Sequence, residues 1–128
     1  MTDPPAVVTV LLVEDEDSVR TVTRRILERD GFQVLEARSG LDGVAVAANT
    51  AQPIDLLITD MLLPDIGGGE VARRIALVQP QIRVLYLSGY TDETLEDHGV
   101  SPDRAHFIQK PFTGEVLRDR IRGLFKDD

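Results

Sequence analysis

The chain has 128 residues, and 14 Lys and Arg against 22 Asp and Glu give it a formal net charge of −8 at pH 7. This length allows one domain with one hydrophobic core, and the lack of cysteine excludes disulfide scaffolds, thiol catalysis and cysteine-ligated metal sites. The acidic balance disfavours binding to nucleic acid or to an anionic membrane surface, which leaves proteins, cations and small molecules as partners.

No linker or internal repeat divides the chain. Residues 1–128 are therefore expected to form a single domain, with a flexible lead at 1–6 and a tail at 126–128. The longest apolar run is far shorter than the roughly 18 residues that a membrane span needs, and the first residues lack the basic and apolar segments of a secretion signal. A cytoplasmic location is expected.

Five short runs rich in β-branched and other apolar residues have the length of β-strands. They cover Val7–Val13, Phe32–Ala37, Ile54–Thr59, Arg83–Leu87 and Ala105–Gln109. The first run is apolar almost throughout rather than alternating, which is typical of a strand buried on both faces of a sheet.

Segments with helical spacing of apolar residues follow these runs. The apolar faces consist of Val19, Val22, Ile26 and Leu27, ended by Gly31; of Leu41, Val44, Ala45 and Ala48 behind the cap Ser39; of Val71, Ile75 and Val78, ended by Pro80; and of Val116, Leu117, Ile121, Leu124 and Phe125 behind Thr113. Another helix, the fourth in chain order, is expected from Asp92 to His98. It should be the shortest and loosest because Leu95 is its one large apolar residue.

This alternation predicts an α/β fold, because parallel strands need crossover connections and right-handed crossovers place helices on both faces of the sheet. We expect a doubly wound, flavodoxin-like (βα)5 sandwich whose parallel five-stranded sheet has the order 2-1-3-4-5. Ligands of such sheets bind beyond the carboxyl ends of the strands, next to the switch point between strands 1 and 3.

The predicted strand ends carry charged and hydroxyl side chains. The first strand ends in the run Glu14-Asp15-Glu16-Asp17, the third in Asp60, the fourth in Ser88 and the fifth in Lys110. A nucleotide site would need a glycine-rich loop, and the first loop is acidic and lacks glycine. Converging carboxylates repel each other unless a cation is bound, so Glu14, Asp15 and Asp60 predict a site for a hard divalent ion such as Mg2+. Glu16 and Asp17 are interpreted as the solvated first turn of a helix.

Lys110 is informative because the chain has 12 arginines and only two lysines. Its compact point charge suits a site made of carboxylates, with an ordinary ion pair as the alternative. Together with Ser88, these groups describe a site that can hold a metal and a phosphoryl group and that offers one carboxylate as nucleophile. The histidines, His98 and His106, lack ligand spacing and are expected at the surface.

From Val7 to Phe125 the chain resembles the receiver domains of bacterial two-component response regulators. The motifs are Leu11-Leu12-Val13-Glu14-Asp15-Glu16, Leu57-Ile58-Thr59-Asp60-Met61-Leu62-Leu63-Pro64, Leu87-Ser88-Gly89-Tyr90 and Phe107-Ile108-Gln109-Lys110-Pro111-Phe112. Each motif is weak alone, whereas all of them in order at this spacing are specific. Residues 85–93 are also similar to the receiver at the C-terminus of hybrid histidine kinases, so the chain is either such a module or a stand-alone regulator.

The resemblance implies that Asp60 is the phosphoacceptor, which attacks the phosphorus of a phosphohistidine to give an acyl phosphate. Asp15, Asp60 and the backbone carbonyl of Leu62 would bind Mg2+ (or Mn2+), and Glu14, in place of the commoner Asp, would act through water. The chain would then be a phosphoacceptor with self-catalysed phosphotransfer and dephosphorylation, not a turnover enzyme.

The resemblance also assigns roles to residues around the phosphoacceptor. Lys110 would pair with the phosphoryl oxygens, and its bond to Pro111 would be cis. Ser88 would hydrogen-bond to the phosphoryl group and move with an inward-turning aromatic residue on strand 5, here Phe107 where many relatives have Tyr. This switch remodels the face formed by helix 4, strand 5 and helix 5.

Leu62 and Tyr90 lie at the positions that tune the lifetime of the acyl phosphate in this family. An apolar Leu62 cannot orient an attacking water, so slow self-dephosphorylation is expected. The implied partners are a sensor histidine kinase, a histidine phosphotransfer protein or both, and a downstream protein target, without direct contact with nucleic acid or membrane. Receivers of this family also often form homodimers through the face of helix 4 and helix 5.

Two alternatives remain at this point. Asp15-Glu16-Asp17 has the D-x-D form of aspartate-nucleophile phosphohydrolases, with Asp15 as nucleophile and Asp17 as general acid, although such enzymes usually have a larger core and a cap. The chain could instead be a receiver-like module that binds partners without being phosphorylated, which the complete set of acids, serine and lysine argues against.

Overall fold

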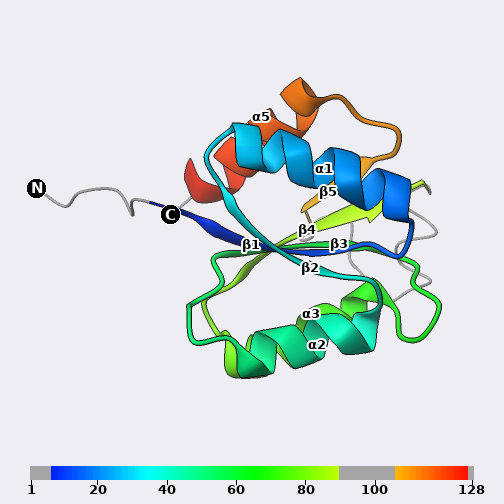
Figure 1. The fold of residues 1–128 in the computed structure, drawn as a ribbon, viewed down its shortest axis with the longest axis vertical. Helices are drawn as coiled ribbons and strands as arrows, with labels where there is room; N and C mark the ends of the chain where they lie inside the picture. The colour runs from blue at the N-terminus through cyan, green and yellow to red at the C-terminus, as the bar shows by residue number, and fades with distance from the viewer. Residues whose placement is uncertain (1–6, 90–105, 127–128) are drawn as a thin grey trace, which may run out of the picture.

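A computed structural model describes residues 7–89 and 106–126, which form a parallel sheet between two layers of helices (Figure 1). The strands are β1 (Thr9–Val13), β2 (Gln33–Ala37), β3 (Leu56–Asp60), β4 (Arg83–Ser88) and β5 (His106–Gln109). The helices are α1 (Asp17–Arg29), α2 (Gly40–Asn49), α3 (Gly68–Val78) and α5 (Gly114–Lys126). The order of the five strands, β2-β1-β3-β4-β5, confirms the predicted doubly wound fold.

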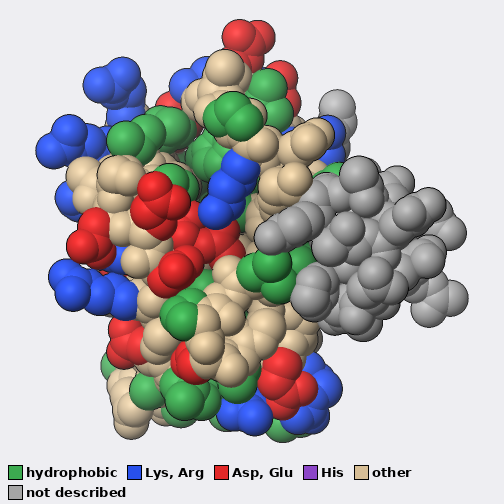
Figure 2. All heavy atoms as spheres, turned by 90° about the vertical axis from the view of Figure 1, so that its right-hand side faces the viewer, with side chains coloured by type: hydrophobic (Ala, Val, Ile, Leu, Met, Phe, Trp, Pro, Cys, Tyr) green, Lys and Arg blue, Asp and Glu red, His purple; other side chains and the backbone are tan. Residues whose placement is uncertain are grey.

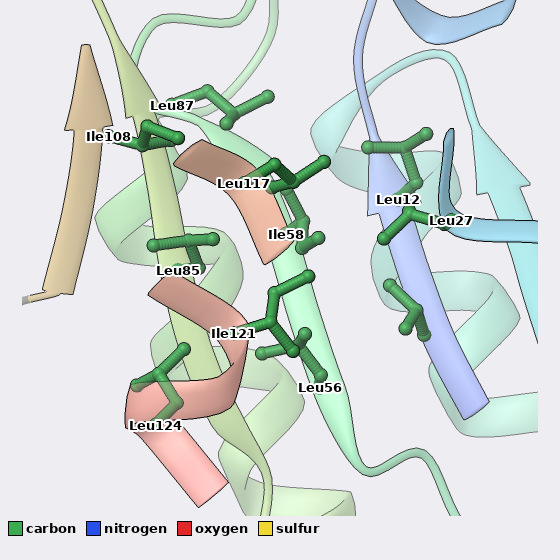
Figure 3. Close-up of a cluster of buried hydrophobic side chains, with 11 residues drawn as sticks. Leu12, Leu27, Leu56, Ile58, Leu85, Leu87, Ile108, Leu117, Ile121 and Leu124 are labelled. Atoms are coloured by element: carbon green, nitrogen blue, oxygen red, sulfur yellow. The ribbon is translucent and has the colours of Figure 1, made fainter. Parts of the chain in front are cut away.

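Helices α1 and α5 cover one face of the sheet, and α2 and α3 cover the other (Figure 1). Every residue of β1 is buried, as its continuous apolar sequence predicts. Because side chains alternate along a strand, Val10 and Leu12 contribute to the core beneath α1 and α5, and Leu11 and Val13 to the core beneath α2 and α3. In the first of these cores, side chains of α5 pack over β3 and β4 (Figure 3); the labelled α5 residues are Leu117, Ile121 and Leu124.

The ends of the elements follow the expected local signals in several places. Ser39 caps α2 by accepting a hydrogen bond from the Asp42 amide at 3.1 Å, and Thr113 accepts one from the Val116 amide at 3.2 Å. Gly31 has φ +93° just after α1, a conformation that favours glycine. Strands β1, β2 and β3 begin later than predicted, because Val7, Phe32 and Ile54 precede the paired registers, whereas β4 begins at Arg83 as predicted.

The predicted apolar face of α2 is wrong for Leu41, Ala45 and Ala48, which are exposed, whereas Val44 packs against the core as predicted. The buried residues of α2 are Gly40, Gly43 and Ala47. The cause is steric: a Cβ on Gly43 would lie 2.7 Å from Cγ2 of Val13, so α2 approaches β1 through its smallest side chains.

Three further apolar residues, Val22 of α1, Val78 of α3 and Val116 of α5, were predicted to be buried but are 57%, 50% and 41% exposed. In α1 the buried positions belong instead to Arg20 and Thr23, next to Leu27. Compared with the predicted orientation, α1 is therefore rotated about its axis so that the charged side chain of Arg20 faces the protein interior. The spacing of apolar residues alone does not predict this orientation.

The predicted helix from Asp92 to His98, together with Tyr90 and residues 1–6 and 127–128, lies outside the described residues. The expected tail at 126–128 is helical at its first position, because α5 extends to Lys126. Within 7–89 and 106–126, no helix has the length and apolar character that a membrane crossing demands.

Candidate phosphoacceptor and metal site

The carboxyl ends of four strands bring the predicted site residues to one edge of the sheet. Glu14 follows β1, Asp60 is the last residue of β3, Ser88 is the last of β4, and Lys110 follows β5. Since β1 and β3 are neighbours, their acids lie at the switch point of the sheet. Figure 2 shows this face, on which acidic side chains gather around a basic one.

Lys110 connects the acids of two strands. Its Nζ lies 2.9 Å from Oε1 of Glu14 and forms an ion pair with Oδ1 of Asp60. Both carboxylates are buried, whereas the lysine side chain is 28% exposed. The Lys110 amide donates to the Ser88 carbonyl at 2.8 Å, and the Lys110–Pro111 peptide bond is cis, as the family resemblance implies.

Three acids form a group that fits a divalent cation. Glu14, Asp15 and Asp60 each offer a carboxylate oxygen, and these oxygens lie within 4.8 Å of one another. Within the described part of the chain, the buried Oδ1 of Asp60 has its ion pair with Lys110 but no hydrogen bond. Hard oxygen donors around a buried oxygen that lacks a hydrogen bond are the chemistry that Mg2+ prefers.

Burial governs the protonation of these groups. Burial raises the pKa of Asp60 to about 8, and its hydrogen bond with Glu14 adds to the increase, while Lys110 opposes it. Burial also opposes ionisation of Glu14, but hydrogen bonds from Asp60, Lys110 and the Glu16 amide hold the pKa of Glu14 below its usual value. In the absence of a cation, the folded site therefore disfavours the ionised form of Asp60, and a bound cation would favour that form.

Lys110 remains charged in this environment. Burial opposes its charge, but the contacts with the carboxylates of Asp60 and Glu14 raise the pKa of the Lys110 ammonium above its usual value. The two buried carboxyl groups therefore have one fixed positive charge between them, that of Lys110. A bound cation would supply a second positive charge.

The remaining predicted site residues lie around this pocket. Ser88 is buried at the end of β4, and Leu62, two residues after Asp60, is 39% exposed. Phe107 is partly buried and packs with Tyr86 against the buried Met61. His106 is exposed, as predicted, whereas Tyr90 lies outside the described residues.

Asp17 does not join the acidic group. Its carboxylate bonds to Arg20, lies 4.0 Å from Nε of Arg38, and is 73% exposed. The cationic partners hold the pKa of Asp17 below its usual value, chiefly through the hydrogen bond from Arg20. An acid held ionised outside the pocket is a poor general acid, which argues against the phosphohydrolase interpretation.

Sequence reasoning missed two residues that shape the site. Arg20, which is buried, donates to the Glu14 carbonyl at 2.8 Å. Gly68 begins α3 so close to β3 that a Cβ would overlap the carbonyl oxygen of Asp60. Arg20 could have been noticed from its spacing of one helical turn from Asp17, which favours an ion pair. No local pattern distinguishes Gly68 from its neighbour Gly67.

A groove of about 490 Å3 lies beside the pocket, between α1 and the loop that follows β5. Its lining is mainly apolar and includes Val19, Val22, Ile26, Pro111 and Phe112, together with Lys110. The exposed Val22 therefore lines this groove, and the groove and the acidic pocket have Lys110 in common.

A family model described as the response regulator receiver domain matches residues 10–122. The sensor kinase CckA of Brucella abortus is 29% identical over 125 residues, 98% of this chain and 13% of the kinase. The response regulator receiver protein CpdR of that organism is 29% identical over 91% of this chain and 93% of its own length. The solved receiver domain of a hybrid histidine kinase CckA has a TM-score of 0.76 and 32% identity, covering 91% of this chain and 97% of that domain. The chain spans about half or less of several other curated relatives.

Proposed function

Because this chain belongs to the response regulator receiver domain family of two-component signalling, we propose that Asp60 is its phosphoacceptor. One observation carries the proposal: Asp60 is buried at the switch point and contacts both Glu14 and the single lysine of the pocket. A carboxylate beside a fixed ammonium and further acids can act as a nucleophile toward phosphorus.

In the proposed reaction, a carboxylate oxygen of Asp60 attacks the phosphorus of a phosphohistidine. A new O–P bond forms, the P–N bond breaks, and the imidazole nitrogen keeps the electron pair of that bond and later takes a proton. Lys110 stabilises the charge on the phosphoryl oxygens, and Ser88 hydrogen-bonds to one of them. The product is an acyl phosphate on Asp60.

Glu14, Asp15, Asp60 and the backbone carbonyl of Leu62 are the groups that would hold Mg2+ or Mn2+, with Glu14 acting through water. Such an ion supplies charge neutralisation for the phosphoryl oxygens. Support comes from the grouping of the three carboxylates within 4.8 Å. Residues Ser88 and Phe107 would then couple the phosphoryl group to the face that carries β5 and α5, and the output passes to a protein partner.

The donor is proposed to be a histidine kinase or a histidine phosphotransfer protein that docks on the apolar groove. The groove shares Lys110 with the pocket, so a protein seated there would hold its phosphohistidine next to Asp60. An apolar hollow beside a reactive group is the expected form of such a docking surface. A Val22→Asp variant should lose transfer from an autophosphorylated histidine kinase while keeping transfer from acetyl phosphate.

Intact mass after incubation with acetyl phosphate and Mg2+ tests the proposal. We expect one added phosphoryl group in the wild-type protein and none in Asp60→Asn or in EDTA. Turnover of p-nitrophenyl phosphate, with Asp15→Asn abolishing it, would instead support the phosphohydrolase. If no adduct forms, a beryllofluoride titration followed by NMR decides the outcome, because shifts around Asp60 indicate a short-lived acyl phosphate and their absence refutes the proposal.

A further inference from the structure

Arg20 is a buried charged residue outside the group of residues to which the reaction has been assigned. Its guanidinium donates through Nη1 to the Glu14 carbonyl at 2.8 Å and through Nη2 to Asp17. Its Nε lies 3.5 Å from Oε1 of Glu36 on β2. The side chain is 8% exposed, so its bonds are formed largely out of water.

The Glu14 carbonyl belongs to the peptide unit that joins Glu14 to Asp15, two members of the acidic group. A peptide unit is planar, so a bond to its oxygen fixes the direction in which both flanking residues leave the chain. The preceding peptide unit is held as well, because the Glu14 amide donates to the Ala37 carbonyl of β2 at 3.1 Å. Arg20 therefore completes the fixation of the backbone that presents both acids.

The other arginine of this network makes a useful contrast. Arg24, one turn further along α1, has its Nε 3.4 Å from the same Glu36 oxygen, and its Nη1 hydrogen-bonds to Glu28 at 3.2 Å. No bond from Arg24 to Glu14 or Asp17 is found within 7–89 and 106–126. Both arginines form an ion pair with Glu36 and so link α1 to β2, but of the two only Arg20 also bonds to the backbone between Glu14 and Asp15.

We propose that Arg20 is a positioning residue for cation binding and phosphoryl transfer: its hydrogen bond to the Glu14 carbonyl holds Glu14 and Asp15 in the orientation that a divalent cation requires. This inference rests on the proposed function, since that function assigns the cation to these acids. Groups that orient metal ligands without touching the metal typically change metal affinity roughly 10- to 100-fold when they are removed.

The test uses the full chain as wild type, Arg20→Met, Arg20→Lys and the matched control Arg24→Met. The Mg2+ dissociation constant of each is measured by NMR titration of backbone amides, and the melting temperature of each is measured in EDTA. We expect Arg20→Met to bind Mg2+ roughly tenfold more weakly, Arg20→Lys to be intermediate because a lysine places its charge without the planar fork, and Arg24→Met to stay within about twofold of wild type.

A purely structural role would lower the melting temperatures of Arg20→Met and Arg24→Met and leave both Mg2+ dissociation constants alike, which would overturn the inference. If Arg20→Met does not fold, Arg20→Lys decides, since an unchanged dissociation constant in that variant contradicts the proposed positioning. Failure of the proposed function has a different signature: the wild-type protein itself would bind no Mg2+ and take no phosphoryl group.

Discussion

The two edges of the sheet use polar side chains in opposite ways. At the amino edge, where the strands begin, polar side chains bond to backbone groups. Asp55 accepts a hydrogen bond from the Thr9 amide at 2.8 Å, and Arg83 donates to the Leu124 carbonyl at 3.0 Å. Each of these bonds satisfies a backbone group at a strand start or a helix end, so these residues stabilise the fold.

At the carboxyl edge, the polar side chains bond chiefly to one another. Glu14 and Asp60 converge on Lys110, and two buried carboxyl groups face a single ammonium. This arrangement is electrostatically incomplete, and burial alone disfavours ionised Asp60. The contrast teaches that a buried polar group serving the backbone is structural, whereas buried groups that satisfy one another incompletely retain capacity for a ligand.

Gly68→Ala is expected to have the largest effect on stability, because the added methyl group would collide with the backbone of β3 at the carboxyl edge. A Cβ at this position would overlap the Asp60 carbonyl oxygen, so α3 or β3 must shift. We expect a loss of at least about 2 kcal/mol of unfolding free energy, measured by urea denaturation. Gly123→Ala is the control: a Cβ there meets nothing within 4 Å, and the change should stabilise α5 by roughly 0.5–1 kcal/mol. Equal effects of the two variants would contradict the close approach.

Asp60→Asn should raise the melting temperature of the protein in EDTA by several degrees, since it removes a carboxylate whose ionisation the folded state disfavours. The pKa of Asp60, about 8, lies above the ordinary value of 3.8, so the folded state binds this proton more tightly than the unfolded state does. Its contribution to stability is therefore full below about pH 4 and is lost as the pH rises through about 8.

Melting curves between pH 4 and pH 9 check the sign of this effect. The gap between Asp60→Asn and wild type should widen with increasing pH in EDTA and shrink when Mg2+ is added, because the cation compensates the ionised acids. A lower melting temperature of Asp60→Asn at every pH would show that the Asp60–Lys110 ion pair outweighs the cost of burial, and that the carboxyl edge is as structural as the amino edge.

The sequence was sufficient for the parts of the molecule that follow a repeated local rule. Short runs rich in β-branched and other apolar residues predicted the five strands, and the residues that end them predicted which side chains meet at one edge. The rules failed where packing selects among similar residues. Small residues rather than Leu41 face the sheet in α2, because Gly43 allows close approach to Val13. Apart from Asp17, one turn away on its own helix, Arg20 bonds to a backbone carbonyl and to an acid on β2, and no periodicity encodes these two partners.

Asp55→Ala tests the amino edge with a smaller effect. The change removes the acceptor of the Thr9 amide, and the loss of one hydrogen bond to a charged group should cost roughly 1–2 kcal/mol in urea denaturation. Acetyl phosphate labelling and Mg2+ affinity should remain those of the wild type, because Asp55 lies at the opposite end of β3 from Asp60. A change in Mg2+ affinity without a change in stability would contradict the division between the two edges.

Leu62→Asn is expected to leave stability nearly unchanged and to alter only the lifetime of the phosphorylated state. Leu62 is 39% exposed just beyond the carboxyl edge, so its replacement by a polar residue leaves no buried group unsatisfied. Whereas leucine cannot hydrogen-bond to an attacking water, asparagine can orient one, and we expect the acyl phosphate to decay roughly three- to tenfold faster, equivalent to about 1 kcal/mol of barrier. Decay of the phosphorylated mass after removal of acetyl phosphate measures this rate. An unchanged decay rate would mean that water reaches the phosphoryl group from a direction that Leu62 does not control. The control is Leu62→Ala, which adds space without a hydrogen-bonding group. It shows whether easier access of water, rather than orientation of the water by asparagine, accelerates the decay.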